Sequence, residues 1–128
     1  MGEAEARQVV ERYIHYLHNR DEEGLASLFA TGSVLTNPLG SYQGREAVRQ
    51  FYGDLFSSYR SYHLGQLRFS VGGDEVSLQW YAEGQPSFQE GPVGMPGCSY
   101  FLIRGGQIQQ LKVYYDAAQL QRQLAAVT

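Results

Sequence analysis

Apolar side chains recur at helical spacing along the first half of the chain. Residues 3–19 and residues 45–59 each carry an apolar stripe that repeats every three or four positions. Between these segments, Asp21 is placed to cap a short helix that ends at Gly32. The apolar positions are Val9, Val10, Tyr13, Ile14 and Leu17 in the first segment, Leu25, Leu28 and Phe29 in the second, and Val48, Phe51, Tyr52, Leu55 and Phe56 in the third. We therefore expect three helices, with one short strand at residues 33–37.

In the second half the period falls to two, which is typical of half-buried strands. The alternating segments cover residues 63–71, 75–83, 98–104 and 107–115. In the first of them, His63 shares a face with the apolar residues that follow it, namely Leu67, Phe69 and Val71. This pattern predicts a four-stranded antiparallel meander, joined by tight Gly-containing turns.

Two further segments complete the prediction. Residues 84–97 are rich in Gly and Pro, and we expect them to form a loop that acts as a lid. Asp116 is placed to cap a last helix at residues 117–127. With no internal repeat and no linker, residues 1–128 are expected to form one domain.

The order of these elements predicts an α+β fold. A curved antiparallel sheet would wrap around the three N-terminal helices and give a cone with an internal cavity, lined by one face of the sheet. The other face carries Tyr81, Tyr100 and Tyr114, which is more aromatic than a freely solvated sheet needs. We expect that outer face to form a homodimer.

Composition and charge exclude several classes of protein. Hydrophobic residues make up 43% and charged residues 18%, which argues against a disordered chain. The net charge is -3 and the basic residues are scattered, so no nucleic-acid surface is expected. No apolar run is long enough to span a membrane, and the N-terminal segment resembles no secretory signal, so we expect a soluble, cytoplasmic protein. Cys98 is the single cysteine and no phosphate-binding loop occurs, so neither a metal nor an organic cofactor is expected.

Three stretches of the sequence resemble the nuclear transport factor 2-like superfamily. They are "VVERYIHYLHNRDEEGLASLFA", "NPLGSYQGREAVRQFY" and "KVYYDAAQLQRQL", and the meander fits the same group. The superfamily includes ketosteroid isomerase, limonene-type epoxide hydrolase and the SnoaL-like polyketide cyclases. The resemblance implies the conical fold, but it leaves the reaction open, because the superfamily hosts several chemistries as well as non-catalytic binders.

The resemblance to ketosteroid isomerase implies roles for four positions. Tyr13 matches the tyrosine of that family's oxyanion hole, and Tyr52 matches a supporting tyrosine. Asn37 stands where the isomerase has its Asp base, and Ser99 stands near its second oxyanion donor. An amide does not abstract a proton near pH 7, so a steroid isomerase of the usual kind is not expected. The epoxide hydrolases lose an acid at Val113, whereas the SnoaL-like cyclases resemble the C-terminal stretch better.

Several candidate residues have two readings. Tyr13 either donates to a ligand oxygen or is a core tyrosine with a backbone partner. His63 has a suitable ordinary pKa for a general base, but a buried neutral histidine is the alternative. Asp116 moves a proton or only caps its helix. Asn37 contacts a ligand or only caps its own turn.

The expected site combines these residues with an aromatic lining. The proposed catalytic residues are Tyr13, His63 and Asp116, and the ligand-binding residues are Tyr16, Asn37, Phe51, Tyr52, Trp80, Ser99, Phe101, Val113 and Tyr115. The first hypothesis is a cofactor-independent enzyme for proton transfer, isomerisation or cyclisation of a small apolar, carbonyl-bearing ligand. The alternatives are a non-catalytic pocket for an apolar metabolite and a dimeric protein-interaction module.

Overall fold

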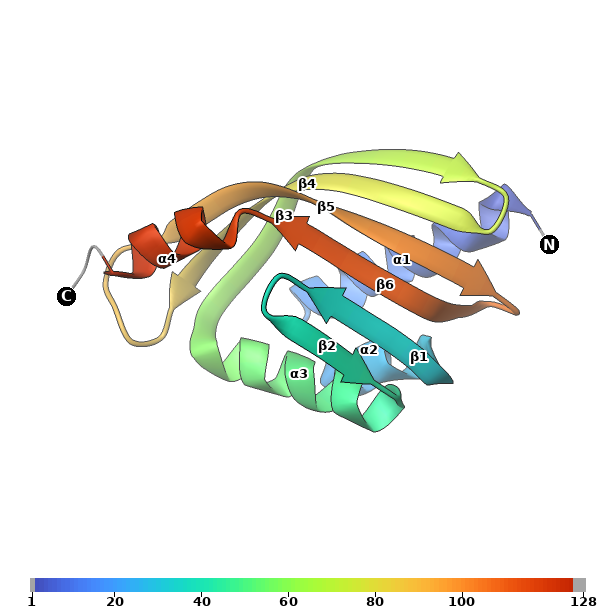
Figure 1. The fold of residues 1–128 in the computed structure, drawn as a ribbon, viewed down its shortest axis with the longest axis horizontal. Coiled ribbons are helices and arrows are strands. Elements are labelled where there is room, and N and C mark those ends of the chain that lie inside the picture. Colours follow the sequence, from blue (N-terminus) through green and yellow to red (C-terminus); the bar gives the residue numbers. More distant parts are fainter. Residues whose placement is uncertain (1, 126–128) are drawn as a thin grey trace.

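The computed structural model describes residues 2–125, in which four helices pack on one curved sheet of six strands (Figure 1). In chain order the elements are α1 (Glu3–His18), α2 (Glu22–Ser27), β1 (Phe29–Asn37), β2 (Gly40–Gln43), α3 (Arg45–Ser58), β3 (Tyr59–Gly72), β4 (Glu75–Pro86), β5 (Val93–Arg104), β6 (Gln107–Tyr115) and α4 (Ala117–Ala125). The predicted α+β fold is confirmed, and so are the three N-terminal helices. The second helix is shorter than predicted, because α2 ends at Ser27 and the strand that was expected at residues 33–37 begins at Phe29. The predicted end of the last helix, at residues 126–127, lies outside the described residues.

The sheet is mixed, where the sequence predicted an antiparallel one. Its strand order is β2-β1-β6-β5-β4-β3, and every neighbouring pair is antiparallel except β1 and β6, which run parallel. The short strand β2 was predicted as part of a loop, because "NPLG" has the composition of a turn. That turn joins β1 to β2 as a hairpin, and so gives the sheet its sixth strand and its outer edge.

The apolar stripes of the helices face the concave side of the sheet. On α1, Val9, Val10, Tyr13 and Leu17 are at most 5% exposed, and the helix packs against β3, β4 and β5. Figure 1 shows α1 behind the sheet and α3 beside the β1–β2 hairpin. The side-chain carboxylate of Asp21 accepts a hydrogen bond from the Gly24 N–H at 2.9 Å, which confirms the predicted cap of α2. The sheet and the helices therefore enclose one core.

A bulge in β3 reverses the side-chain alternation that the sequence predicted for this strand. Gly65 pairs with Tyr81 and Arg68 pairs with Gln79, so two residues of β3 oppose a single residue of β4 between these pairs. The bulge places Gln66 at a φ of 52°. Because alternation has a period of two, one extra residue exchanges the faces on either side of it. His63 consequently points outward, and the prediction that it shares a face with the apolar residues further along the strand is wrong.

The predicted lid at residues 84–97 is also mostly strand. β4 extends to Pro86 and β5 begins at Val93, so the connection comprises only residues 87–92. The glycines of this segment suggested a loop, but in the structure they leave space for neighbouring aromatic rings. A Cβ on Gly94 would lie 2.9 Å from the hydroxyl of Tyr81, and one on Gly97 would overlap the indole of Trp80.

Candidate ligand-binding pocket

A pocket of about 340 Å³ lies between the concave face of the sheet and helices α1, α3 and α4. This volume is at the small end of the range for small-molecule sites. Eight of the predicted site residues line it, namely Tyr13, Asn37, Phe51, Tyr52, Trp80, Ser99, Val113 and Tyr115. Sequence reasoning missed further lining residues, among them Leu17, Tyr42, Leu55, Tyr59, Tyr62, Leu64, Ala82, Val93 and Met95. The walls are therefore largely apolar and aromatic.

Two buried tyrosines form the polar centre of the pocket. The hydroxyl groups of Tyr13, on α1, and Tyr52, on α3, are 2.6 Å apart. Burial raises the pKa of Tyr13 to about 12, although its hydrogen bond with Tyr52 opposes the rise. Burial, and then the neighbouring Tyr13, raise the pKa of Tyr52 well above its ordinary value. Both phenols are neutral near pH 7, and because one donates to the other, the second keeps a proton to donate.

Tyr62 is one of the other phenols that line this pocket. Burial raises its pKa, with Tyr13 the next largest cause. It lies on β3 before the bulge, on the same face as Leu64, and both line the pocket. The one available signal was that Tyr62 and Leu64 alternate with His63, but the apolar residues beyond the bulge suggested the opposite face.

Trp80 and Ser99 provide a second polar point. The indole Nε1–H of Trp80 donates to Ser99 Oγ at 3.0 Å, and Ser99 is 4% exposed. An indole N–H only donates, so Ser99 Oγ must accept, and its own proton remains available. Gly97 pairs directly with Trp80 across the sheet, and the missing side chain there gives the ring its space.

Asn37 lines the pocket and also caps its own turn. Its Oδ1 accepts hydrogen bonds from the backbone N–H groups of Leu39 at 2.8 Å and Gly40 at 3.1 Å. The oxygen is therefore committed to the β1–β2 turn, as the alternative reading of the sequence held. Only the Nδ2 group of the amide is left to meet a ligand.

The sequence profile of the SnoaL-like domain matches residues 10–111 of the chain. The chain belongs to the SnoaL-like domain family. A comparison with curated protein sequences gives no significant match.

Solved structures share this SnoaL-like fold at low sequence identity. A candidate polyketide cyclase from Xanthomonas campestris pv. campestris is 22% identical, with 98% of each chain covered and a TM-score of 0.83. A candidate SnoaL-like polyketide cyclase from Jannaschia sp. CCS1 is 17% identical over 97% of this chain and 94% of its own, with a TM-score of 0.85. An LEH-like epoxide hydrolase from M. tuberculosis is 17% identical over 97% of this chain and 92% of its own, with a TM-score of 0.82. At these identities the likeness establishes the fold alone.

In this SnoaL-like pocket, the two residues predicted to move protons lie outside the lining. His63 is exposed on the outer side of β3 and stacks on His18, with ring centroids 4.6 Å apart. Asp116 is exposed and caps α4, because its Oδ1 accepts from the Gln119 N–H at 3.1 Å. The bulge accounts for the first displacement, and the start of a helix accounts for the second.

Two predicted ligand contacts also lie elsewhere. Tyr16 packs against Gly24, between α1 and α2, and does not line the pocket. Phe101 is fully buried behind the lining, where its ring meets that of Tyr13 with centroids 5.1 Å apart. Phe101 thus positions the tyrosine without reaching the pocket.

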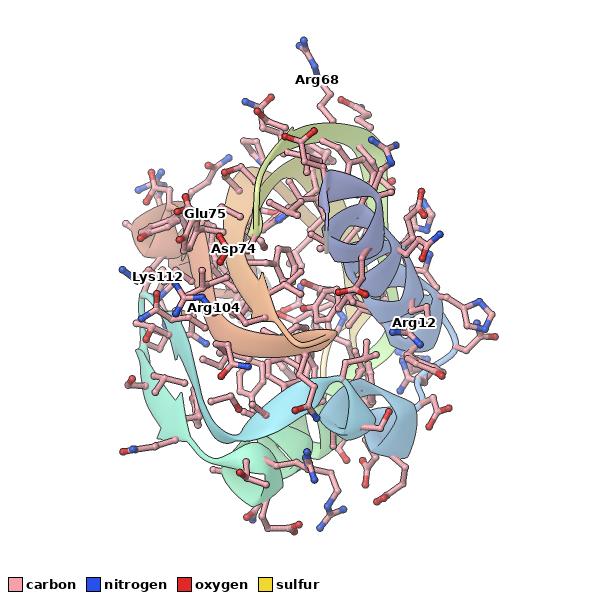
Figure 2. The ribbon with its side chains drawn as sticks, turned by 90° about the vertical axis from the view of Figure 1, so that its right-hand side faces the viewer. Arg12, Arg68, Asp74, Glu75, Arg104 and Lys112 are labelled. Atoms are coloured by element: carbon pink, nitrogen blue, oxygen red, sulfur yellow. The ribbon has the colours of Figure 1, made fainter. Side chains whose placement is uncertain are left out.

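The described lining contains no Asp, Glu, His, Cys, Lys or Arg. Charged side chains lie on the outside of the fold, as Figure 2 shows for Arg12, Arg68 and Lys112. The Arg104 Nε–H donates to Asp74 Oδ2 at 3.0 Å, and both of these side chains are exposed. Within residues 2–125, no three potential metal ligands cluster, and no helix is long and apolar enough to cross a membrane. The polar chemistry of the described pocket is that of phenols, an indole N–H, the hydroxyls of Ser58 and Ser99, and an amide.

Proposed function

We propose that the protein binds a small apolar molecule that carries a carbonyl or enol oxygen, and that the Tyr13–Tyr52 pair donates a hydrogen bond to that oxygen. The observation that carries the proposal is the 2.6 Å phenol pair in a largely apolar pocket. A buried donor without an acceptor is costly, so a ligand that supplies an acceptor there gains affinity.

The walls and the remaining polar groups support the same class of ligand. The rings of Phe51, Trp80 and Tyr115 offer flat apolar surface, and Val113 adds aliphatic surface. Ser99 and the Nδ2 group of Asn37 add further donors. A pocket with several donors and no cation suits a neutral, acceptor-bearing molecule.

Proton transfer, with isomerisation or cyclisation, is the second candidate function. Phenols that donate to a carbonyl oxygen stabilise the corresponding enolate more strongly, because its oxygen carries more negative charge. The candidate cyclases among the structural neighbours point in the same direction. No carboxylate or imidazole lies in the described lining, so the proton acceptor would be water, hydroxide or a group on the ligand itself. Binding is therefore the first proposal and catalysis the second.

A ketone and its matched hydrocarbon test the binding proposal. Trp80 is the only tryptophan, so its fluorescence reports occupation of the pocket. We expect 2-tetralone to bind more tightly than tetralin, which has the same shape without the oxygen. Tyr13→Phe should weaken 2-tetralone binding by roughly fivefold to tenfold, the worth of one hydrogen bond, and leave tetralin binding unchanged.

Equal affinity for the two probes would overturn the binding proposal, as would an equal loss for both in Tyr13→Phe. The same probe tests the second candidate, because enolisation breaks the C1–H bond and a deuteron from D₂O replaces the proton. Faster exchange at C1 with the protein than with buffer, reduced in Tyr13→Phe, would support proton transfer. Exchange at the buffer rate would leave the protein a binder.

A further inference from the structure

Helix α4 forms one wall at the mouth of the pocket. Its Leu120 and Leu124 line the pocket, as do Leu39 of the β1–β2 turn and Phe88 of the β4–β5 loop. Leu39 is 73% exposed and Phe88 is 67% exposed, so they mark the solvent-facing rim. Figure 1 places α4 and the β4–β5 loop together at one end of the molecule.

One side chain ties α4 to the sheet. The Oε1 atom of Gln123 accepts from the Gly94 N–H at 2.8 Å, and its Nε2 group donates to the Gly94 carbonyl oxygen at 2.8 Å. Gly94 pairs with β4 through Glu83, but β5 meets β6 only from Gly97, which pairs with Tyr115. The amide of Gln123 thus occupies the place of a strand neighbour that β6 does not provide.

The rest of α4 is lightly held. None of the side chains at residues 117–124 is fully buried, whereas α1 buries six. Few buried apolar contacts are the mark of a segment that opens locally at low free-energy cost. The two hydrogen bonds of Gln123 are therefore a large share of what keeps α4 closed.

We propose that α4 is a lid over the pocket, called the door below, which opens about Asp116. The two hydrogen bonds between the Gln123 amide and Gly94, called the latch, hold it closed. Gln123 is then a positioning residue that sets how fast molecules enter and leave the pocket. The inference rests on the proposed function only for the ligand. The opening of α4 itself can be measured through the access of a neutral solute to the pocket, and such a solute needs no binding site.

The latch is tested with Gln123→Ala, and Gln121→Ala is the matched control, since Gln121 is exposed on the same helix. The first readout is hydrogen exchange at the Gly94 amide, and the second is quenching of Trp80 fluorescence by acrylamide. We expect Gln123→Ala to accelerate both on the order of tenfold, the combined effect of two net hydrogen bonds, and Gln121→Ala to change neither. With 2-tetralone, the association and dissociation rates should both rise while the dissociation constant changes less.

A second variant separates the latch from a general loss of structure. In Gln123→Glu the carboxylate repels the Gly94 carbonyl oxygen at pH 7, so the door should open. A protonated carboxyl group restores one donor and one acceptor, so quenching should return toward the wild-type rate as the pH falls toward about 4.3. The wild type measured at the same pH values corrects for other acid effects.

The outcomes distinguish the door from the proposed function. If 2-tetralone does not bind the wild type, the proposed function fails. Acrylamide quenching of Trp80 still tests whether α4 opens over the pocket. The door is overturned if Gly94 exchange accelerates in Gln123→Ala while acrylamide quenching does not. The proposal is equally overturned if Gly94 exchange is unchanged in Gln123→Ala, because the hydrogen bonds of Gln123 then do not keep α4 closed.

Discussion

His18 and His63 form a stacked pair on the surface, away from the pocket. The Nε2 atom of His18 accepts a hydrogen bond from the Leu64 N–H at 3.0 Å, and the two imidazole centroids are 4.6 Å apart. Burial, and then the neighbouring His63, lower the pKa of His18 from its ordinary value of 6.5. A protonated Nε2 has no lone pair, so protonation also breaks the bond to Leu64. Leu64 lines the pocket, so protonation of His18 breaks a hydrogen bond to the backbone of a pocket residue.

We expect the pair to make the fold less stable in mild acid. The folded-state pKa of His18 lies below the unfolded value near 6.5, so the unfolded chain binds more protons there. Its contribution is present above pH 6.5 and is lost as the pH falls through the folded-state pKa. The free energy of unfolding, measured with urea at about pH 7.5 and about pH 5, should fall by less than about 1 kcal/mol, the net worth of one hydrogen bond, because His18 is partly exposed to solvent. The fall should shrink in His63→Gln, which removes the second charge.

His15→Gln is the matched control, because His15 is exposed on the same helix and should leave the fall unchanged. An equal fall in His18→Gln would show that another group is responsible.

The packing of Trp80 on β4 requires that Gly97, on the neighbouring strand β5, has no side chain. The Trp80 ring fills the space in which a Cβ on Gly97 would lie, and the same ring bonds to Ser99. Gly97→Ala should therefore displace the indole and cost about 1–3 kcal/mol of stability, the range for overpacking. Chemical denaturation measures the loss, and the fluorescence of Trp80 should change with it. Gly72→Ala is the control, since a Cβ at that position would meet no heavy atom within 4 Å.

Unchanged stability and unchanged fluorescence in Gly97→Ala would contradict this prediction, because they would show that the Trp80 ring does not need the space at Gly97.

The sequence predicted those elements whose hydrophobic pattern is regular. The stripes of α1 and α3 placed Tyr13 and Tyr52 inside, and the alternation of β4 placed Trp80 inside. It failed where backbone geometry departs from a simple period. The bulge in β3 carries Tyr62 inward and His63 outward. Its signals in the sequence were weak, namely Gly65 inside the strand and the alternation of Tyr62 and Leu64 with His63.

The glycines of β4 and β5 misled for a related reason. They have the composition of a loop, but their role depends on aromatic rings that approach them. Gly84 faces the ring of Tyr59, Gly94 faces that of Tyr81, and Gly97 faces that of Trp80. Such contacts belong to the folded arrangement of the strands and not to the local sequence. The loop was therefore predicted to be longer than it is.

At the scale of the whole molecule, the outer face of the sheet carries Tyr81, Tyr100 and Tyr114, and Tyr114 is 55% exposed. We propose, as the sequence suggested, that a second copy covers this face across a two-fold axis. Sedimentation at micromolar concentration should give a mass of about twice 14.4 kDa. Tyr114→Glu should shift the protein to the monomer, because the carboxylate would be desolvated in the interface.

Gln43→Glu adds the same charge on β2, at the far edge of the sheet, and should leave the dimer intact. A wild-type monomer under these conditions would contradict the proposal.

The bulge in β3 also affects how relatives should be compared. An alignment that runs through residues 65–68 without a gap assumes that the strand keeps one alternation throughout, but here the inward positions change from even to odd numbers across the bulge. In a relative that lacks the extra residue, such an alignment would match His63 to an inward side chain that is not its structural equivalent. Transfer of site residues between members of this family therefore needs each half of β3 to be aligned separately.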